Sequence, residues 1–146
     1  MLPYKKLTLT ATDMNKIETN IVQQTLLQKI PNLQGIYIFG SYGTEHATQS
    51  SDIDIALLAR PSIDSWQRFE VEQILASKLK RRVDLVDLTQ VGLVMQKQIV
   101  THGQRIYTLD EASSEQFEDV VWAKYLRFNE LRRGIIDDIQ QRGSVY

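Results

Sequence analysis

Apolar positions change their spacing along this chain, and each change predicts a switch between helix and strand. Val71, Leu75 and Leu79 recur every four residues, which is typical of a helix with one buried side. The run from Arg82 to Asp87 combines β-branched residues with an alternating pattern, which is typical of a strand. On such grounds we expect helices at about 13–30, 64–80 and 92–101, and strands at about 34–39, 52–58, 82–87 and 104–109.

The last and longest pattern predicts a C-terminal helix over about 113–140. Ser113 and Gln116 together have the form of a capping box, which favours a helix start at this point. One apolar stripe along the helix consists of Phe117, Val120, Val121, Phe128, Leu131, Ile135 and Ile139. Three other apolar residues lie off the stripe: Trp122, Tyr125 and Ile136. One interpretation is that they are core or self-association residues, and the other is that they form a partner-docking face.

Local signals predict where the other helices begin and end. Thr12 is a good N-cap for the first helix, and Pro31 stops it. Gly103 is a favourable residue just beyond the third helix, and His102 is expected to interact with the dipole of that helix. Helices and strands thus alternate around a small sheet, so the predicted fold class is α/β (α+β), a small mixed β-sheet flanked by helices. We expect one domain over 1–146, with its core at about 12–109.

Composition narrows the classes of function. The 17 basic residues nearly cancel the 18 acidic ones, so no overall charge favours nucleic acid, and no direct nucleic-acid binding is expected. The chain has no cysteine, which excludes thiol catalysis, disulfide bonds and cysteine-ligated zinc. No stretch approaches the ~18 consecutive apolar residues of a membrane span, and no apolar segment follows the first residues. A cytoplasmic protein without membrane contact is therefore expected.

The segment from Gly40 to Asp54 carries most of the candidate chemistry. It joins two apolar strands, and its turn at Gly40 and Ser41 offers backbone N–H groups and a hydroxyl to phosphate oxygens. Asp52 and Asp54 lie two apart on a strand, so they point to the same face and are suited to hold a divalent metal together. A phosphate-binding turn beside a pair of metal-binding carboxylates is what nucleotidyl transfer requires.

A third carboxylate is expected near the nucleophile in such a site. Asp84 is the best candidate, because it lies between Val83 and Leu85, where an unpaired charge is costly. Three carboxylates at close range repel one another unless a cation offsets their charge. Asp87 is the second candidate, although it points to the other face of the strand and also fits a simple strand end.

The order Gly40-Ser41, ten further residues and then Asp52-Ile53-Asp54 resembles the signature of the DNA polymerase β-like nucleotidyltransferase superfamily. Within it, the chain is most similar to the minimal nucleotidyltransferases that are paired with HEPN-domain toxins, over about 17–109. The resemblance includes Val83–Asp87 and, more weakly, Ile99–Tyr107. The long last helix is similar to the extra C-terminal helix of such antitoxins.

The resemblance implies the nucleotidyltransferase fold and a defined activity. Such proteins bind ATP with Mg²⁺, of which two ions are expected, and transfer AMP to a tyrosine of the partner toxin, an RNase, with release of pyrophosphate. Both the modification and the binding silence the toxin. By this resemblance Gly40 and Ser41 hold the triphosphate, and Asp52 and Asp54 hold the metal. Asp84 is implied as the third acid, which also holds metal and helps to deprotonate the tyrosine hydroxyl.

The chain departs from the family pattern directly after Ser41. Many relatives carry arginines there, whereas this chain has Tyr42-Gly43-Thr44. Charge for the triphosphate then comes from metal or from a distant base, and Arg82, on the same strand face as Asp84, is the candidate. The alternative is that Arg82 belongs to a solvated basic helix end. His46 is likewise either a phosphate contact or a surface residue.

Three functions are compatible with the sequence. The preferred one is an antitoxin that acts as a Mg²⁺-dependent protein adenylyltransferase on its cognate HEPN-domain toxin. The second is a small-molecule nucleotidyltransferase of the aminoglycoside-modifying kind, although those relatives usually carry a further helical domain for which this chain leaves little room. The third is an antitoxin that acts by occlusive binding alone, and the intact acidic residues argue against it.

Overall fold

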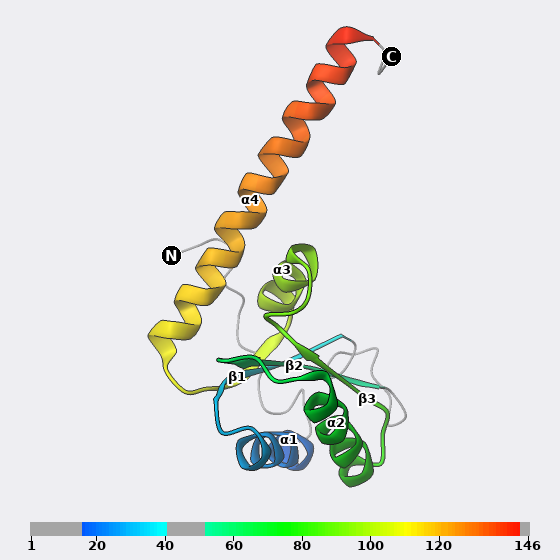
Figure 1. Ribbon diagram of the computed structural model, residues 1–146, viewed down its shortest axis with the longest axis vertical. Helices are drawn as coiled ribbons and strands as arrows, with labels where there is room; N and C mark the ends of the chain where they lie inside the picture. The colour runs from blue at the N-terminus through cyan, green and yellow to red at the C-terminus, as the bar shows by residue number, and fades with distance from the viewer. Residues whose placement is uncertain (1–15, 41–51, 144–146) are drawn as a thin grey trace.

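The computed structural model describes residues 16–40 and 52–143. The helices are α1 (Lys16–Lys29), α2 (Ser65–Leu79), α3 (Leu93–His102) and α4 (Glu111–Arg142). The strands are β1 (Leu33–Phe39), β2 (Ile53–Ala59), β3 (Val83–Asp87) and β4 (Gln104–Thr108). These elements follow the predicted order, and the predicted fold class is confirmed (Figure 1).

The strands form one mixed sheet in the order β3-β2-β1-β4. β1 pairs antiparallel with both β2 and β4, whereas β2 pairs parallel with β3. The parallel pair requires a crossover connection, which α2 provides. As a result, the last residue of β1 and the first residues of β2 and β3 meet at one end of the sheet.

The larger core lies between the sheet and the helices α1 and α2, which cover the same face (Figure 1). Alternate strand residues point to this face, so the period of two in the sequence becomes one apolar layer. The helices supply matching rows, and the row expected in α2 is buried. The buried members of the two helix rows are Val22, Leu26, Ile30, Val71, Leu75 and Leu79.

A smaller core lies on the opposite face, beneath α3 and the first part of α4. Its buried residues are Tyr37, Ala56, Leu88, Ile99, Val100 and Val121. Trp122 and Tyr125 also belong to this junction, because their rings stack edge to face at 6.1 Å and Lys97 lies over both. Of the two interpretations left open for these aromatic residues, the structure supports helix–helix packing.

A buried polar network fastens the start of α4 to the sheet. The Tyr37 hydroxyl donates to Glu118 Oε2 at 2.7 Å, and Arg105 Nη1 donates to the same oxygen at 2.6 Å. Arg105 also pairs with Glu111. Burial raises the pKa of Tyr37 above its ordinary value, and the negative charge of Glu118 raises it further, so the phenol remains a proton donor.

The N-terminal end of α4 differs from the prediction. α4 begins at Glu111, and its N-cap is Asp110, whose carboxylate accepts from the backbone N–H of Ser113 at 3.2 Å. The Ser113 hydroxyl donates to the same carboxylate at 2.5 Å. The expected capping box of Ser113 and Gln116 was therefore wrong, because Asp110 caps the helix three residues earlier and Ser113 lies inside its first turn.

The other helix ends agree more closely. α3 extends through His102, one residue beyond the expected end, and the side chain lies in the last turn as predicted. Gly103 follows it, but in extended rather than left-handed backbone. Glycine is needed there because a Cβ would lie 2.5 Å from the Ile99 carbonyl oxygen. The expected helix start at Thr12 and Asp13 lies outside the described residues.

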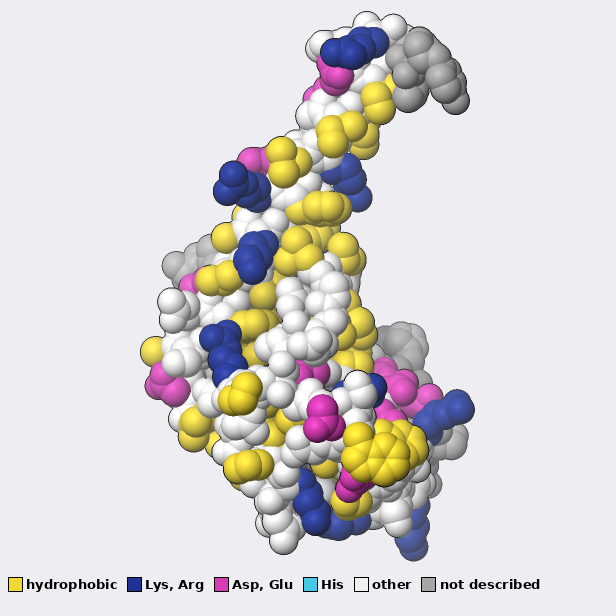
Figure 2. Space-filling model, viewed as in Figure 1, with side chains coloured by type: hydrophobic (Ala, Val, Ile, Leu, Met, Phe, Trp, Pro, Cys, Tyr) yellow, Lys and Arg dark blue, Asp and Glu magenta, His cyan; other side chains and the backbone are white. Residues whose placement is uncertain are grey.

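Beyond its first half, α4 leaves the rest of the molecule and projects into solvent (Figure 1). From Leu126 to Arg142 every residue except Asn129 is exposed. The distal part of the predicted stripe is therefore not covered, and Leu131 and Ile135 are more than 60% exposed. Figure 2 shows hydrophobic side chains along this helix. None of the helices in residues 16–40 and 52–143 is both long and apolar enough to cross a membrane.

We predict that Glu118→Ala lowers the free energy of unfolding by about 2–3 kcal/mol, because it leaves the Tyr37 hydroxyl and the Arg105 guanidinium without their shared acceptor. Tyr37→Phe removes one hydrogen bond and is expected to cost about 1 kcal/mol. Urea unfolding at neutral pH measures both. Glu130→Ala, at an exposed position of the same helix, is the control and should change stability little. Equal stability of the Glu118 and Glu130 variants would contradict the role of the network.

Candidate functional site

The candidate carboxylates meet at the end of the sheet where β1 ends and β2 and β3 begin. Asp54 on β2 is directly opposite Phe39 on β1 and directly opposite Asp84 on β3. Residues paired in this way point to the same face of a sheet. That face is the one covered by α3 and α4, because Asp54 and Asp84 alternate with core residues of the other face. Asp52 lies just before β2 and is partly exposed.

The electrostatics of Asp54 show that the three carboxylates act on one another. Partial burial raises the pKa of Asp54 above its ordinary value, and the negative charges of Asp84 and Asp52 raise it further. A hydrogen bond with Asp84 contributes in the same direction. Asp52 and Asp54, chosen for their spacing, and Asp84, chosen for its place between two apolar residues, are therefore close enough in space for Asp84 and Asp52 to act on Asp54.

Gly40 packs against the Asp54 carboxylate. Its φ is +76°, a left-handed conformation that side chains other than glycine rarely adopt. A Cβ at this position would lie 2.1 Å from Asp54 Oδ2, so any other residue here would displace the carboxylate. Glycine is thus required both by the turn and by the close approach of the carboxylate. Ser41 and His46, the other candidates of this segment, lie outside the described residues.

The remaining candidates on β3 have different surroundings. Arg82 is exposed just before the strand, and its carbonyl accepts from the Ile53 N–H at 3.0 Å. Asp87 ends the strand and is 3% exposed, with Oδ1 accepting from the backbone and the hydroxyl of Thr89 at 2.9 and 2.6 Å. Asp87 therefore shapes a turn, whereas Arg82 is exposed two residues before Asp84.

The basic run before β3 is not a uniformly solvated helix end. Arg81 pairs with Glu18 of α1 through two contacts, Nε to Oε2 at 2.7 Å and Nη2 to Oε1 at 3.1 Å. Both side chains are largely buried, so this pair joins α1 to the end of α2. Arg81 is therefore a structural anchor, whereas Lys78, Lys80 and Arg82 of the same run are exposed.

The donor set suits a hard divalent cation. Asp52, Asp54 and Asp84 present only carboxylate oxygens, which Mg²⁺ prefers. The raised pKa of Asp54 reflects burial first and then repulsion by Asp84 and Asp52, and a bound cation would relieve that repulsion. In the described residues no group of three or more His, Cys, Asp or Glu side chains is already gathered around one point as a cation site. Asp54 and Asp84 form the close pair, with Asp52 at its margin.

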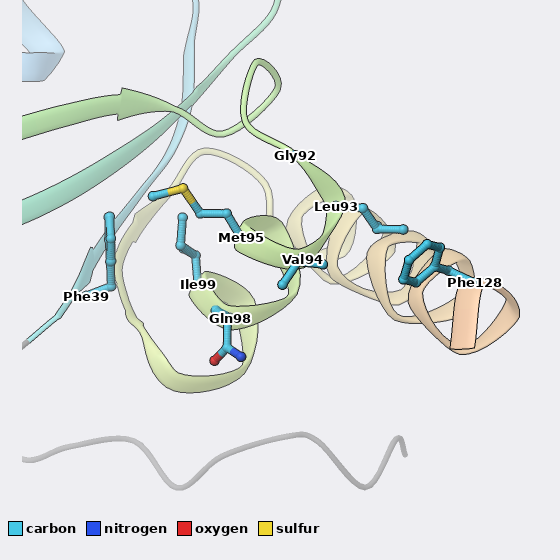
Figure 3. Close-up of a pocket in the computed structure, with 8 residues that line it drawn as sticks. All are labelled: Phe39, Gly92, Leu93, Val94, Met95, Gln98, Ile99 and Phe128. Atoms are coloured by element: carbon cyan, nitrogen blue, oxygen red, sulfur yellow. The ribbon is translucent and has the colours of Figure 1, made fainter. Parts of the chain in front are cut away.

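An apolar groove of about 740 Å³ lies beside the carboxylates, and the sequence analysis did not anticipate it. Figure 3 shows Phe39 at one end, Phe128 of α4 at the other and side chains of α3 between them. Its α3 lining consists of Leu93, Val94, Met95, Gln98 and Ile99. The available signal was the run Leu93-Val94-Met95 at a helix start, which is apolar on more sides than one buried face requires.

Similar proteins place this chain in a known family. Residues 20–112 match the family described as polymerase beta, nucleotidyltransferase. The protein adenylyltransferase MntA of Shewanella oneidensis is 40% identical over 128 residues, which span 86% of this chain and 90% of MntA.

Two solved structures agree with that match. One is a tri-AMPylated Shewanella oneidensis HEPN toxin in complex with its MNT antitoxin, with a TM-score of 0.73, 38% identity and coverage of 87% of this chain and 99% of that chain. The other is a toxin-antitoxin structure with AMP-PNP, with a TM-score of 0.73, 39% identity and coverage of 84% and 98%. The chain therefore belongs to the polymerase beta nucleotidyltransferase family.

Proposed function

We propose that this chain is an antitoxin that transfers AMP from ATP to a tyrosine of a partner HEPN-domain toxin and thereby neutralises it. The observation that carries the proposal is the alignment of Asp54 with Asp84 across β2 and β3, with Gly40 packed against the Asp54 carboxylate. This arrangement occurs in a chain 40% identical to a protein adenylyltransferase. The related complexes with a tri-AMPylated toxin and with AMP-PNP support the same substrate and partner.

In the proposed reaction the tyrosine hydroxyl oxygen attacks the α-phosphorus of ATP. The new bond joins that oxygen to the α-phosphorus, the bond from the α-phosphorus to its bridging oxygen breaks, and pyrophosphate leaves. Asp84 is assigned to accept the phenol proton, since it lies beside Asp54 at the strand start. Gly40 offers its backbone N–H to the triphosphate, and Ser41 adds the next N–H and a hydroxyl.

Asp52, Asp54 and Asp84 are the residues that would hold Mg²⁺. Two bound ions would offset the charge that develops on the attacking and leaving oxygens. Arg82 is assigned to the outer phosphates, because it is exposed and lies two residues before Asp84. An ATP-dependent antitoxin acts where ATP is abundant, so we place the protein in the cytoplasm.

Occlusive binding and small-molecule transfer remain the alternatives. The uncovered apolar face of distal α4 favours a protein partner over a small molecule. Binding and catalysis are separable, because the carboxylates lie at the end of the sheet and distal α4 projects away from it. A cell-growth assay with an inactive variant therefore measures how much occlusion contributes.

We predict that Asp52→Asn/Asp54→Asn lowers AMP transfer by at least about 1,000-fold while the chain stays folded. Asp84→Asn should lower kcat by about 100-fold, as expected for loss of a general base. Intact-mass spectrometry of the toxin after incubation with Mg²⁺ and ATP counts the AMP groups added. Glu70→Gln, which removes an exposed carboxylate on α2, is the control and should transfer AMP normally. Undiminished transfer by the double variant would refute the proposed site.

The repulsion at Asp54 generates a prediction about stability. Without divalent cation, Asp54→Asn should raise Tm by about 2 °C at neutral pH, because it removes a charge next to Asp84 and Asp52. Since the pKa of Asp54 is raised on folding, the wild type takes up a proton on acidification and the advantage of the variant should vanish as pH falls towards the ordinary pKa of 3.8.

With Mg²⁺ or Mn²⁺ present, the wild type rather than Asp54→Asn should have the higher Tm. Either ion is expected to raise the Tm of the wild type and to leave that of Asp54→Asn nearly unchanged, because binding to the folded state alone stabilises it. Thermal scans with EDTA and with each cation measure both effects. A cation-dependent Tm increase of the same size in wild type and variant would contradict the assignment of Asp54 as a ligand.

A further inference from the structure

The groove between α3, the end of β1 and α4 is open and almost entirely apolar. Val94 and Met95 are 53% and 38% exposed, and Phe128 is 41% exposed. Among the described residues that line it, Gln98 is the one with a polar side chain. Apolar side chains that converge on a groove without filling it are typical of a site for another apolar group.

The groove reaches the carboxylates through Phe39. Phe39 lines the groove, is directly opposite Asp54 in the sheet and immediately precedes Gly40. Opposed residues of antiparallel strands have Cβ atoms about 5 Å apart. A group that occupies the groove at its Phe39 end is therefore close to Asp54 and Gly40.

At the other end, the groove continues into the uncovered stripe of α4. Phe128 belongs to both, and Leu131, Ile135 and Ile139 follow it at spacings of three and four residues, on one side of the helix. Figure 2 shows hydrophobic side chains along this helix. A half-helix without packing of its own is rarely stable in water, so a partner is expected to cover it.

The extent of the similarity points to the same partner. The family match ends at residue 112, close to the start of α4. The match to the relative solved in complex with a HEPN toxin spans 87% of this chain. Residues 1–112 are a smaller share of the chain than that, so the match must include part of α4. The helix is thus shared with a toxin-binding relative and lies outside the general catalytic domain.

We infer that the groove and the stripe of distal α4 form one docking surface for the HEPN toxin, and that the groove receives the apolar segment that carries the acceptor tyrosine. This inference rests on the proposed function. The chemistry fits, because a tyrosine ring is accommodated by apolar and aromatic walls while its hydroxyl extends towards Asp54 and Asp84. The groove residues are positioning residues, since they act through the placement of the acceptor.

The test uses Val94→Gln/Met95→Gln, which makes the groove polar without adding charge near the triphosphate. Both positions are in the first turn of α3 and exposed, so the fold should be retained. The matched control is Trp66→Gln/Phe69→Gln, an exposed aromatic pair near the start of α2. α2 covers the opposite face of the sheet.

We expect the groove variant to raise the KM for the toxin by about tenfold, with the KM for ATP and the kcat at saturating toxin unchanged within about twofold. Calorimetric titration in the Asp52→Asn/Asp54→Asn background should show the same loss of toxin affinity without turnover. The control variant Trp66→Gln/Phe69→Gln should leave the KM for the toxin and the calorimetric toxin affinity unchanged. A groove variant with wild-type affinity, or a control that loses as much, would overturn the inference.

Two further outcomes distinguish a failure of this inference from a failure of the proposed function. If the wild type adds no AMP to the toxin but the groove variant still binds it about tenfold more weakly, the proposed function fails and the docking surface stands. Sedimentation velocity identifies the competing occupant. If the wild type alone forms a dimer that the groove variant disrupts, and toxin affinity is unchanged, the groove is a contact between copies of this chain and the inference is wrong.

Discussion

The register of β1, β2 and β3 is the constraint on which the site depends. It places Phe39, Asp54 and Asp84 side by side at one end of the sheet and on one face. A slip of one residue in β2 would turn Asp54 into the large apolar core and expose the core residues beside it. The burial of Ile53, Ile55 and Leu57 on one face of β2 fixes the register of the strand. Because the register is fixed, Asp54 is held on the opposite face.

Sequence alone predicted this part of the molecule well, for a physical reason. Strand side chains alternate strictly, so Asp52 and Asp54 were expected to share a face. In the structure Asp54 lies on β2 and Asp52 lies just before that strand. Gly40 was expected to approach phosphate, and the structure adds a second demand on it, the contact with the Asp54 carboxylate. What spacing did not provide was the pairing of β3 with β2, which brings Asp84 to Asp54 and depends on the crossover through α2.

The features that the sequence did not reveal depend on contacts between distant segments. The bond between Tyr37 and Glu118 joins residues 81 positions apart, and neither residue has a pattern that predicts the other. The predicted N-cap of α4 was wrong because Asp110 and Ser113 are both good N-cap residues. The sequence alone does not show which of the two starts the helix, and in the structure it is Asp110. The stripe of α4 was predicted correctly as a stripe, but periodicity does not say whether its own chain covers it.

Within residues 16–40 and 52–143, the molecule has a part that positions the carboxylates and a part, distal α4, whose apolar side chains are exposed. The polar network of Tyr37, Glu118 and Arg105 lies at the boundary, because it fixes the start of α4 to the catalytic sheet. The network thereby anchors the start of α4, and Phe128 further along the same helix joins the exposed stripe to the groove beside Phe39. A partner that covers the stripe is then oriented with respect to the carboxylates before any chemistry occurs, which is how binding energy far from the reacting atoms lowers the entropy cost of the transfer.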